Sequence, residues 1–314
     1  MLVLKFDKLK VDKLVKEWFT STALGEWRRL QRDAYHKIEF MVTMHFLEKY
    51  LPRKGLLLDA GGGPGRYTIE LAKEGYEIIL LDLVPKMLKL AKRRAKRAGV
   101  LGNVKRFVQG SVEDLSIFSE NTFDAVLCLG GPLCHLLNIE QREKAVAELV
   151  RVAKKGTPLF VSVISRVGLL RSILVEFPHE MKYAKHHWEI GDYMPSLHGE
   201  GFTAAHWFMP EELQDLFERH NAETMELAGL EGLSSHHRKE TNRLKKDQEK
   251  WAMWTELLLK TCTHPSVAGS SEHFLLVCRK RKSANLQGYP CRDEVSNGSR
   301  LIFLRSPRPE RITS

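Results

Sequence analysis

The sequence predicts an α/β fold in which helices cover both faces of a doubly wound, mostly parallel sheet. Between residues 56 and 165, short apolar runs alternate with stretches of helical periodicity, the pattern of parallel strands joined by crossover helices. The runs are apolar at successive positions, as expected of strands buried on both faces. A glycine-rich turn, DAGGGPG at residues 59–65, begins as the first run ends. These observations place most of the sheet within residues 56–165.

The elements are expected in the following order along the chain. Apolar residues recur at three- and four-residue spacing from Gly25 to Tyr50, so residues 1–50 should be helical. Helices are expected at 64–75 and 85–99, which begin at proline and stop at glycine. Later elements are a helix at 209–220, a strand at 223–232, a long helix at 238–260 and a strand at 271–280. The earlier strands are expected at 56–60, 77–83, 104–110, 123–130 and 157–165.

Three segments lie outside this alternation. Residues 1–50 precede the sheet and are expected to form a helical cap segment. Residues 166–208 interrupt the main domain, 51–282, with an apolar stretch followed by a segment rich in His, Trp, Tyr and Gly. We expect this insert to form a cap over the substrate. Residues 283–314 show little periodicity and are rich in Ser, Asn, Gly, Pro and Arg, which predicts a basic, disordered tail.

The composition predicts a globular, cytoplasmic protein. With 314 residues, of which 43% are hydrophobic and 28% charged, the chain can bury a sizeable core. No apolar run approaches the roughly 18 residues needed to span a membrane, and the charged N-terminal residues are unlike a signal peptide. The five cysteines show no CxxC spacing, which argues against a zinc site or a disulfide framework.

The net charge of +10 raises the question of a nucleic-acid partner. From Arg279 to Ser314 the chain holds nine Lys or Arg and three Asp or Glu, so +6 of the excess lies in this C-terminal stretch and only +4 in the other 278 residues. The further cluster KRRAKRAG at 92–99 has the pattern of a solvated helix face. A small molecule is therefore the favoured partner, and nucleic acid is the alternative.

The glycine-rich turn discriminates between ligand classes. A strand followed by such a turn and a helix directs backbone N–H groups and the helix dipole at a ligand. A phosphate-binding P-loop would need Gly-Lys-Ser/Thr, whereas Gly65 is followed by Arg66 and Tyr67. The dinucleotide fingerprint GxGxxG would need its third glycine at position 66, but here it falls at 65. A turn kept only for tight strand–helix packing is the remaining alternative.

Two acidic residues indicate a cationic cofactor. Asp59 precedes the glycines, and a carboxylate there would repel a pyrophosphate but attract a sulfonium and an amino group. Asp82 ends the next expected strand, where it can accept hydrogen bonds from both hydroxyls of a ribose. S-Adenosylmethionine carries all of these groups. It is the predicted cofactor, with S-adenosylhomocysteine as its product.

With these motifs, residues 25–282 resemble the class I S-adenosylmethionine-dependent methyltransferases, in particular the small-molecule group that includes ubiquinone-biosynthesis-like enzymes. The resemblance implies a Rossmann-like, seven-stranded, mostly parallel sheet with strand order 3-2-1-4-5-7-6, strand 7 being antiparallel. Further segments match the family at LVPKMLKLAKRRA (83–95), QGSVEDL (109–115), FDAVLCLGGPLCHL (123–136) and FTAAHWFMPEELQDLFERHN (202–221).

The resemblance also implies roles for individual residues. The loop that contains Asp59, Gly61, Gly63 and Gly65 would wrap the methionine part of the cofactor, and Asp82 would bind its ribose.

On the adenine side, Leu83 and Met87 would flank the ring. Ser111 stands where the family commonly has an aspartate that meets the adenine amino group, and Val112 follows it. Leu129 belongs to the loop after the fourth strand, which passes beside the methyl group.

His135 is the candidate for catalysis or acceptor contact. It lies in the loop after the fourth strand, at the edge where a parallel sheet exposes its functional residues. A general base would help if the acceptor is a hydroxyl or an amine that must lose a proton. The alternative is a histidine that packs beneath the cofactor.

The cap is expected to hold the acceptor. Its dense aromatic and histidine residues suit a planar or partly apolar molecule. His206 and Trp207 are candidates for acceptor contact, and so is Tyr35 of the N-terminal segment. Arg29, Arg32 and Tyr35 precede the core, in the region where members of the resembled family close over the cofactor. No carboxylate pair has metal-ligand spacing, so no metal is expected.

The predicted function is methyl transfer to an O or N atom of a small molecule. DNA and RNA amino-methylases carry a [DNS]-P-P-[YFW] motif after the fourth strand, where this chain has LGGPLC. No cysteine lies in a cytosine-C5 methylase motif. Two alternatives stay open: an RNA or protein methyltransferase that uses the basic tail, and a cofactor-binding protein without catalysis.

Overall fold

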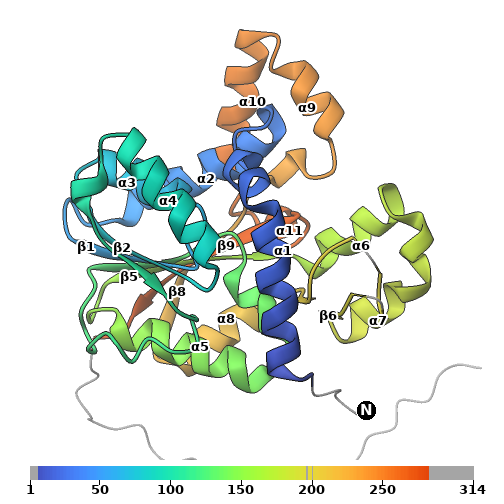
Figure 1. Ribbon diagram of the computed structural model, residues 1–314. Helices are drawn as coiled ribbons and strands as arrows, with labels where there is room; N and C mark the ends of the chain where they lie inside the picture. Colours follow the sequence, from blue (N-terminus) through green and yellow to red (C-terminus); the bar gives the residue numbers. More distant parts are fainter. Residues whose placement is uncertain (1–5, 196, 200, 283–314) are drawn as a thin grey trace, which may run out of the picture. The chain divides into compact units, whose positions relative to one another are not determined.

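The computed structural model describes residues 6–195, 197–199 and 201–282. Seven strands form one sheet in the order β3-β2-β1-β4-β5-β9-β8 (Figure 1). β1 to β5 pair in parallel, and β9 runs antiparallel between β5 and β8. In this sheet β8 is the sixth strand along the chain and β9 is the seventh, because β6 and β7 form a separate ribbon. The expected strand order 3-2-1-4-5-7-6 is therefore confirmed. The strands are β1 Leu56–Ala60, β2 Glu77–Asp82, β3 Val104–Gln109, β4 Ala125–Cys128, β5 Pro158–Ile164, β8 Ala222–Gly229 and β9 His273–Lys280.

Helices cover both faces of the sheet because successive strand residues point to opposite sides. Leu57 of β1 belongs to the core formed with α2 (Ala34–Tyr50) and α3 (Arg66–Lys73), and Ala95 of α4 (Pro85–Arg97) joins it. Leu58 belongs to the opposite core, formed with α5 (Ile139–Val152) and α8 (Pro210–Arg219). β3 departs from the expected burial on both faces, since Lys105 and Arg106 are exposed on this edge strand.

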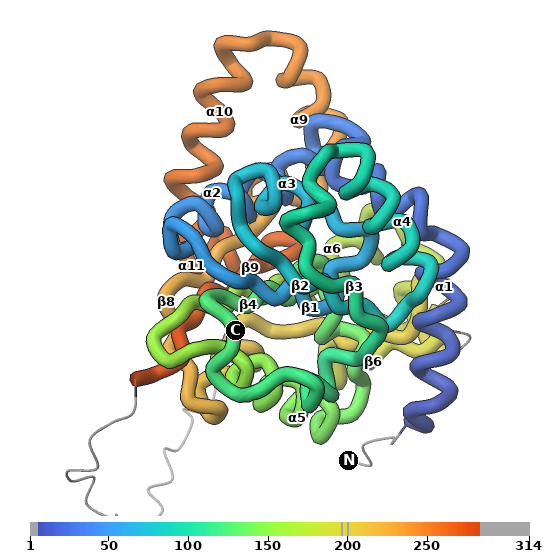
Figure 2. The backbone as a smooth tube through the Cα atoms, turned by 60° about the vertical axis from the view of Figure 1, so that its left-hand side comes forward, coloured from blue at the N-terminus to red at the C-terminus, as the bar shows by residue number. Residues whose placement is uncertain are grey.

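The first helix, α1 (Lys8–Arg29), links the start of α4 to the cap. Ala23 packs against Val84 and Met87, at the end of β2 and the start of α4. Nearer the N-terminus, Val11 and Val15 pack with Met194 and Ala204 of the insert, together with Leu137. Figures 1 and 2 both show α1 beside α4.

The insert leaves the sheet at β5 and returns to it. It contains α6 (Arg166–Val175), α7 (Ala184–Glu189) and a two-stranded ribbon of β6 (Asp192–Tyr193) and β7 (Ala205–His206). A bridge between Ser165 and Phe208 joins its two ends. The Arg166 guanidinium donates to the Trp207 carbonyl at 3.0 Å and to Glu212 at 3.0 Å, which ties the insert to α8.

Two expected helices are interrupted. The segment 25–50 is divided after Arg29, and α2 starts anew at Ala34, because the Asp33 carboxylate accepts from His36 N–H and caps the new helix. The segment 238–260 is divided into α9 (Arg238–Leu244) and α10 (Gln248–Thr261), again at an aspartate cap, Asp247. α9 and α10 stand together at the top of Figures 1 and 2, and α11 (Pro265–Ala268) leads into β9.

Among the described residues, no helix is both long enough and apolar enough to cross a membrane. The expected disordered tail, 283–314, lies outside the described residues. The four described cysteines, Cys128, Cys134, Cys262 and Cys278, are free and buried.

Candidate active site

The turn between β1 and α3 depends on glycine for its geometry. Gly61, Gly63 and Gly65 have φ angles of 78°, 54° and 79°, in the left-handed region that favours glycine. A Cβ on Gly61 would lie 2.4 Å from Cγ of Pro132, and one on Gly62 would lie 2.5 Å from the Asp59 carboxylate. The turn is therefore closely packed on its inner side.

A cavity, here called the glycine-loop cavity, lies against this turn. With the open solvent at its mouth it has a volume of about 1050 Å³. Its walls come from the turn, the ends of β2, β3 and β4, and α1. Nine of the residues singled out from the sequence line it: Gly61, Gly63, Asp82, Leu83, Met87, Ser111, Val112, Leu129 and His135. The structure thus brings together residues spread over 75 positions of the sequence.

Asp82 places a buried carboxylate in the wall of this cavity. Its two oxygens accept from Gly63 N–H and Val84 N–H, each at 2.8 Å. Burial raises the pKa of Asp82 to about 6, against the lowering effect of those two hydrogen bonds. The carboxylate is thus oriented from two sides and still has lone pairs available for hydroxyl donors.

Asp59 and Gly65 lie beneath the turn and not among the lining residues of the cavity. Asp59 accepts a hydrogen bond from the Thr68 hydroxyl through Oδ2, while Oδ1 has no hydrogen-bond partner among the described residues. A Cβ on Gly65 would approach Ala91 Cβ at 3.1 Å. Both residues therefore support the turn from below, and their direct contact with the cofactor stays a prediction.

Burial raises the pKa of Asp59 to about 6, and hydrogen bonds from Thr68 oppose the shift. An unfolded aspartate has a pKa of about 3.9, so the native state binds this proton more tightly. Its stability should therefore fall as the pH rises from 4 to 6. Asp59→Asn should remove this penalty and stabilise the cofactor-free chain by about 3 kcal/mol at pH 8, but not at pH 4.

Urea denaturation of wild type and variant at both pH values measures this effect. Asp215→Asn, an exposed substitution on α8, is the control and should change stability equally little at both. An equal effect of Asp59→Asn at pH 4 and pH 8 would contradict the prediction.

The adenine side of the cavity differs from the family pattern. The Ser111 hydroxyl is within hydrogen-bond distance of Glu113, 3.2 Å from its carboxylate and 3.3 Å from its N–H. Glu113 in turn is bound by Lys8 of α1 and by Gln141. Asp12 of α1 also lines the cavity. The helix α1 therefore supplies a carboxylate to the cavity, in which Ser111 stands at the position where the family commonly has an aspartate.

His135 lines the same cavity from the 3₁₀ turn Pro132–His135. Its Nδ1 lies 2.9 Å from the Ala204 carbonyl, so Nδ1 carries the hydrogen and Nε2 keeps a lone pair. Burial lowers the pKa of His135 to about 4, although the bond to Ala204 opposes the shift. The ring is therefore neutral at pH 7 and offers a hydrogen-bond acceptor of low basicity.

A second cavity, here called the aromatic cavity, lies under the insert. Phe177, Tyr193, Phe202 and Trp207 line it, together with apolar residues of β5 and α6. Trp207 is thus on its wall, and its contact with an acceptor stays a prediction. The volume is about 710 Å³ including open solvent.

His206 and Tyr35 lie behind these walls. The ring nitrogens of His206 meet the carboxylates of Asp192 at 2.6 Å and Glu212 at 2.7 Å, and its exposed fraction is 2%. The Tyr35 hydroxyl donates to Glu272. Neither residue lines either cavity: His206 anchors the insert to α8, Tyr35 positions Glu272, and their contacts with an acceptor stay predictions.

The two cavities share a thin wall. The His135 ring lies 5.8 Å from the Phe202 ring, centroid to centroid, with one residue lining each cavity. The wall also includes Gly131, where a Cβ would lie 3.8 Å from Ile164 of the aromatic cavity. The linings of the two cavities are therefore in contact at His135 and Phe202.

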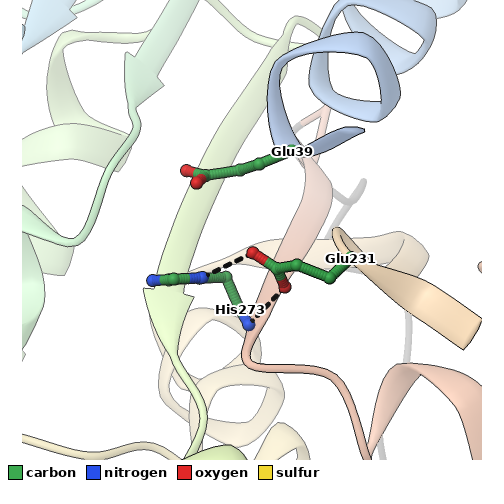
Figure 3. Close-up of side chains that lie close together, drawn as sticks. All are labelled: Glu39, Glu231 and His273. Atoms are coloured by element: carbon green, nitrogen blue, oxygen red, sulfur yellow. Dashed lines mark hydrogen bonds and ion pairs between the residues drawn. The ribbon is translucent and has the colours of Figure 1, made fainter. Parts of the chain in front are cut away.

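An ion-paired cluster of Glu39, Glu231 and His273 (Figure 3) lies beside the aromatic cavity, which His273 lines. Glu39, Glu231 and His273 place one ligand atom each within 4.8 Å of one another, a spacing that a metal ion could bridge. Both carboxylates already have partners: Glu39 is held by the two terminal nitrogens of Arg29, and Glu231 accepts from Nδ1 of His273 at 2.7 Å. The groups satisfy one another as ion pairs, and we assign no metal to them.

Comparison with known proteins identifies the domain around the glycine-loop cavity. A family model described as "Methyltransferase domain" matches residues 57–156, from β1 to just before β5. Residues 57–156 are thus those of a methyltransferase domain, which supports the expected resemblance to the class I S-adenosylmethionine-dependent methyltransferases. The match ends before the insert, so it covers the donor side of the site and not the aromatic cavity.

Curated relatives that are methyltransferases match a stretch of similar length, between 113 and 119 residues. The chain is 36% identical over 113 residues to the ubiquinone/menaquinone biosynthesis C-methyltransferase UbiE of Citrobacter koseri, a match covering 35% of this chain and 43% of the relative. It is 34% identical over 119 residues to the UbiE of Idiomarina loihiensis, covering 36% and 45%. The chain thus spans less than half the length of these relatives.

Solved structures of low identity share the fold over a longer stretch. A S-adenosylmethionine-dependent methyltransferase from Methanosarcina mazei has a TM-score of 0.53 at 20% identity, covering 76% of this chain and 98% of its own. The 1,6-didemethyltoxoflavin-N1-methyltransferase of Burkholderia thailandensis has a TM-score of 0.52 at 17% identity, covering 90% and 94%.

Sequence reasoning missed two groups of site residues. Asp12, Val15, Phe19 and Glu26 of α1 line the glycine-loop cavity, and their spacing on one helix face was the available signal. Glu231, Glu272 and His273 come from the segment around β8 and β9. No local pattern marks them, because the contact between residues 231 and 273 exists only once β8 and β9 have paired.

Proposed function

We propose that this chain is a S-adenosylmethionine-dependent methyltransferase that holds the methyl donor in the glycine-loop cavity and a small-molecule acceptor in the aromatic cavity. The observation that carries the proposal is the Asp82 carboxylate, buried in the cavity wall and oriented by Gly63 and Val84 beside a glycine turn. The acceptor atom is proposed to be O or N.

The residues of the glycine-loop cavity fit the parts of the donor. Asp82 would accept hydrogen bonds from the ribose hydroxyls. Leu83, Val84 and Met87 provide apolar walls for the adenine, and Asp12 offers a carboxylate for its amino group. Gly61 and Gly63 leave the turn free of side chains, so a ligand can approach the backbone closely.

The donor supplies an electrophilic methyl group on a sulfonium. The chain's part is to bring an acceptor atom into line with that methyl group and to exclude water. His135, on the wall between the cavities, would orient the acceptor through its Nε2 lone pair. Its low pKa makes it a hydrogen-bond acceptor in this role more than a base.

A second candidate is methyl transfer to carbon, favoured by the names of the curated relatives. The aligned part of those relatives is about a third of this chain, and the family match ends at residue 156. The insert and the aromatic cavity lie beyond it. For this reason we favour O or N.

Isothermal titration of the full chain with S-adenosylmethionine and S-adenosylhomocysteine tests the donor site, and both are expected to bind. Incubation with methyl-labelled S-adenosylmethionine and a metabolite extract then tests transfer, since an enzyme moves the label to a small molecule. Mass spectrometry of that product separates O-, N- and C-methylation. Folded protein that binds neither ligand would refute the proposal.

A further inference from the structure

The lining of the aromatic cavity includes three acidic or histidine residues that the proposed function does not use, Glu180, Glu272 and His273. Glu272 and His273 line it side by side, where β9 begins next to the end of β5. Their side chains are 21% and 23% exposed. Ionisable groups in a wall that is otherwise largely aromatic and aliphatic indicate specific recognition of a polar group.

Glu272 presents a free oxygen. Its Oε1 accepts from the Tyr35 hydroxyl and from His236 N–H at 2.9 Å. Its Oε2 makes no hydrogen bond within the described part of the chain. Tyr35 and His236 thus orient the carboxylate and leave one oxygen available to a ligand in the cavity.

His273 is oriented in the same way by a different partner. Glu231 accepts from Nδ1 at 2.7 Å and from the backbone N–H of the same residue at 2.8 Å. The second ring nitrogen, Nε2, points away from Glu231 in Figure 3 and has no hydrogen-bond partner among the described residues. Glu231 is itself buried and bound by Ser271. A carboxylate that fixes one ring nitrogen and leaves the other free is the arrangement of a proton-transfer histidine.

The charge around the aromatic cavity favours a cation. Glu26 and Glu39 share Arg29, Glu231 pairs with His273, and Glu272 pairs with His236, a histidine that is neutral at pH 7 because burial lowers its pKa to about 4. The facing walls, Phe177, Tyr193, Phe202 and Trp207, are aromatic, and aromatic faces attract ammonium groups. An anionic acceptor would meet an excess of carboxylates.

We propose that the aromatic cavity binds a primary or secondary amine on an apolar or aromatic body, that Glu272 holds its ammonium group, and that His273 removes the proton before methyl transfer. This inference rests on the proposed function. Of the two acceptor atoms proposed above, oxygen and nitrogen, it selects nitrogen.

The proposed transfer conserves atoms and charge. The ammonium R–NH₃⁺ gives one proton to Nε2 of neutral His273, and the freed lone pair of nitrogen attacks the methyl carbon. The carbon–sulfur bond breaks and its electron pair stays on sulfur, which yields S-adenosylhomocysteine and R–NH₂⁺–CH₃.

The basicity of His273 matches this task. Burial lowers the pKa of His273, but Glu231 and Glu39 raise it by more, so that it lies at about 9, with Arg29 opposing. An alkylammonium of the lysine type has a pKa of about 10.4. Proton transfer between groups of similar pKa has little free-energy cost.

Three probes with one aromatic body test the binding step: phenethylamine, 2-phenylethanol and phenylacetate, titrated into the full chain saturated with S-adenosylhomocysteine. Phenethylamine should bind at least tenfold more tightly than the neutral alcohol, and phenylacetate most weakly. Glu272→Gln should remove this preference, whereas Glu256→Gln, an exposed substitution on α10, should keep it. Equal binding of all three probes, preference for the anion, or no binding of phenethylamine at millimolar concentration would overturn the proposal.

Methyl transfer to phenethylamine tests the proton step. His273→Gln should lower kcat by about 100-fold, with the affinity for S-adenosylhomocysteine unchanged as the sign of an intact fold. The wild-type rate should rise between pH 7 and 9 and the variant's should not, a difference that a structural role alone would not produce. An unchanged pH profile would contradict the role of His273. Failure to bind S-adenosylhomocysteine would instead refute the proposed function.

Discussion

Replacing Asp82 by alanine should weaken the binding of S-adenosylmethionine by about 10- to 150-fold. Hydrogen bonds to a charged group contribute roughly 1.5–3 kcal/mol, and the Asp82 carboxylate is the group that we assign to the ribose. The variant also loses the acceptor for Gly63 N–H and Val84 N–H, which hold the turn and the start of α4. Isothermal titration measures the affinity.

Two variants separate the charge from the rest of the side chain. Asp82→Asn keeps the size and one acceptor oxygen, so its loss of affinity should be smaller than that of the alanine variant. Asp215→Asn, far from the cavity on α8, should bind as wild type does. Wild-type affinity in Asp82→Ala would show that the ribose does not lie at this carboxylate.

The same carboxylate makes binding depend on pH. The pKa of Asp82 is raised to about 6 in the cofactor-free chain, and the charged form is the better acceptor for hydroxyl donors. Affinity should therefore fall as the pH drops from 7 to 5. In Asp82→Asn this decrease should be reduced, since the titrating group is gone.

Gly61→Ala should destabilise the chain by about 2–5 kcal/mol. Alanine at a φ of 78° costs roughly 1–2 kcal/mol of backbone strain. Its Cβ would also lie 2.4 Å from Cγ of Pro132, an overlap of the kind that costs about 1–3 kcal/mol when a packed site is overfilled. Urea denaturation of the cofactor-free chain measures the change.

The matched control lies two residues further on. Gly63 has a φ of 54°, also in the left-handed region, but a Cβ there would meet no atom within 4 Å. Gly63→Ala should therefore cost only the strain. Pro132→Gly in the Gly61→Ala background should recover part of the loss, because it removes the atoms that the new Cβ meets. Equal destabilisation by the two alanine variants would show that contact with Pro132 is unimportant.

Much of the donor side could be predicted from sequence because its determinants are local. The positive φ angles of the turn follow from glycines that are neighbours in the chain, and the place of Asp82 follows from the strand that it ends. Parallel strands bring their carboxyl ends to one edge of the sheet. The positions of Ser111 and Leu129 beside that turn therefore follow from the expected strands alone.

Helix boundaries were predictable where a proline or glycine marks them and not where an aspartate does. α4 begins at Pro85, as expected. The interruptions at Asp33 and Asp247 were missed, because the apolar spacing continues across both and only the side-chain cap ends the periodicity.

The acceptor side depended on tertiary structure, because its contacts join residues that are distant in the chain and carry no shared local pattern. His206 belongs to a region whose composition suggests a substrate wall, but it is buried between Asp192 and Glu212 behind that wall. Glu231 and His273 meet only because β8 and β9 pair, and α1 closes the glycine-loop cavity only because Ala23 packs on Met87. The backbone conformation of a turn or a helix end depends on neighbouring residues, so the sequence alone predicts it. The contacts of a side chain depend on how distant segments pack, and this packing is a property of the whole folded chain.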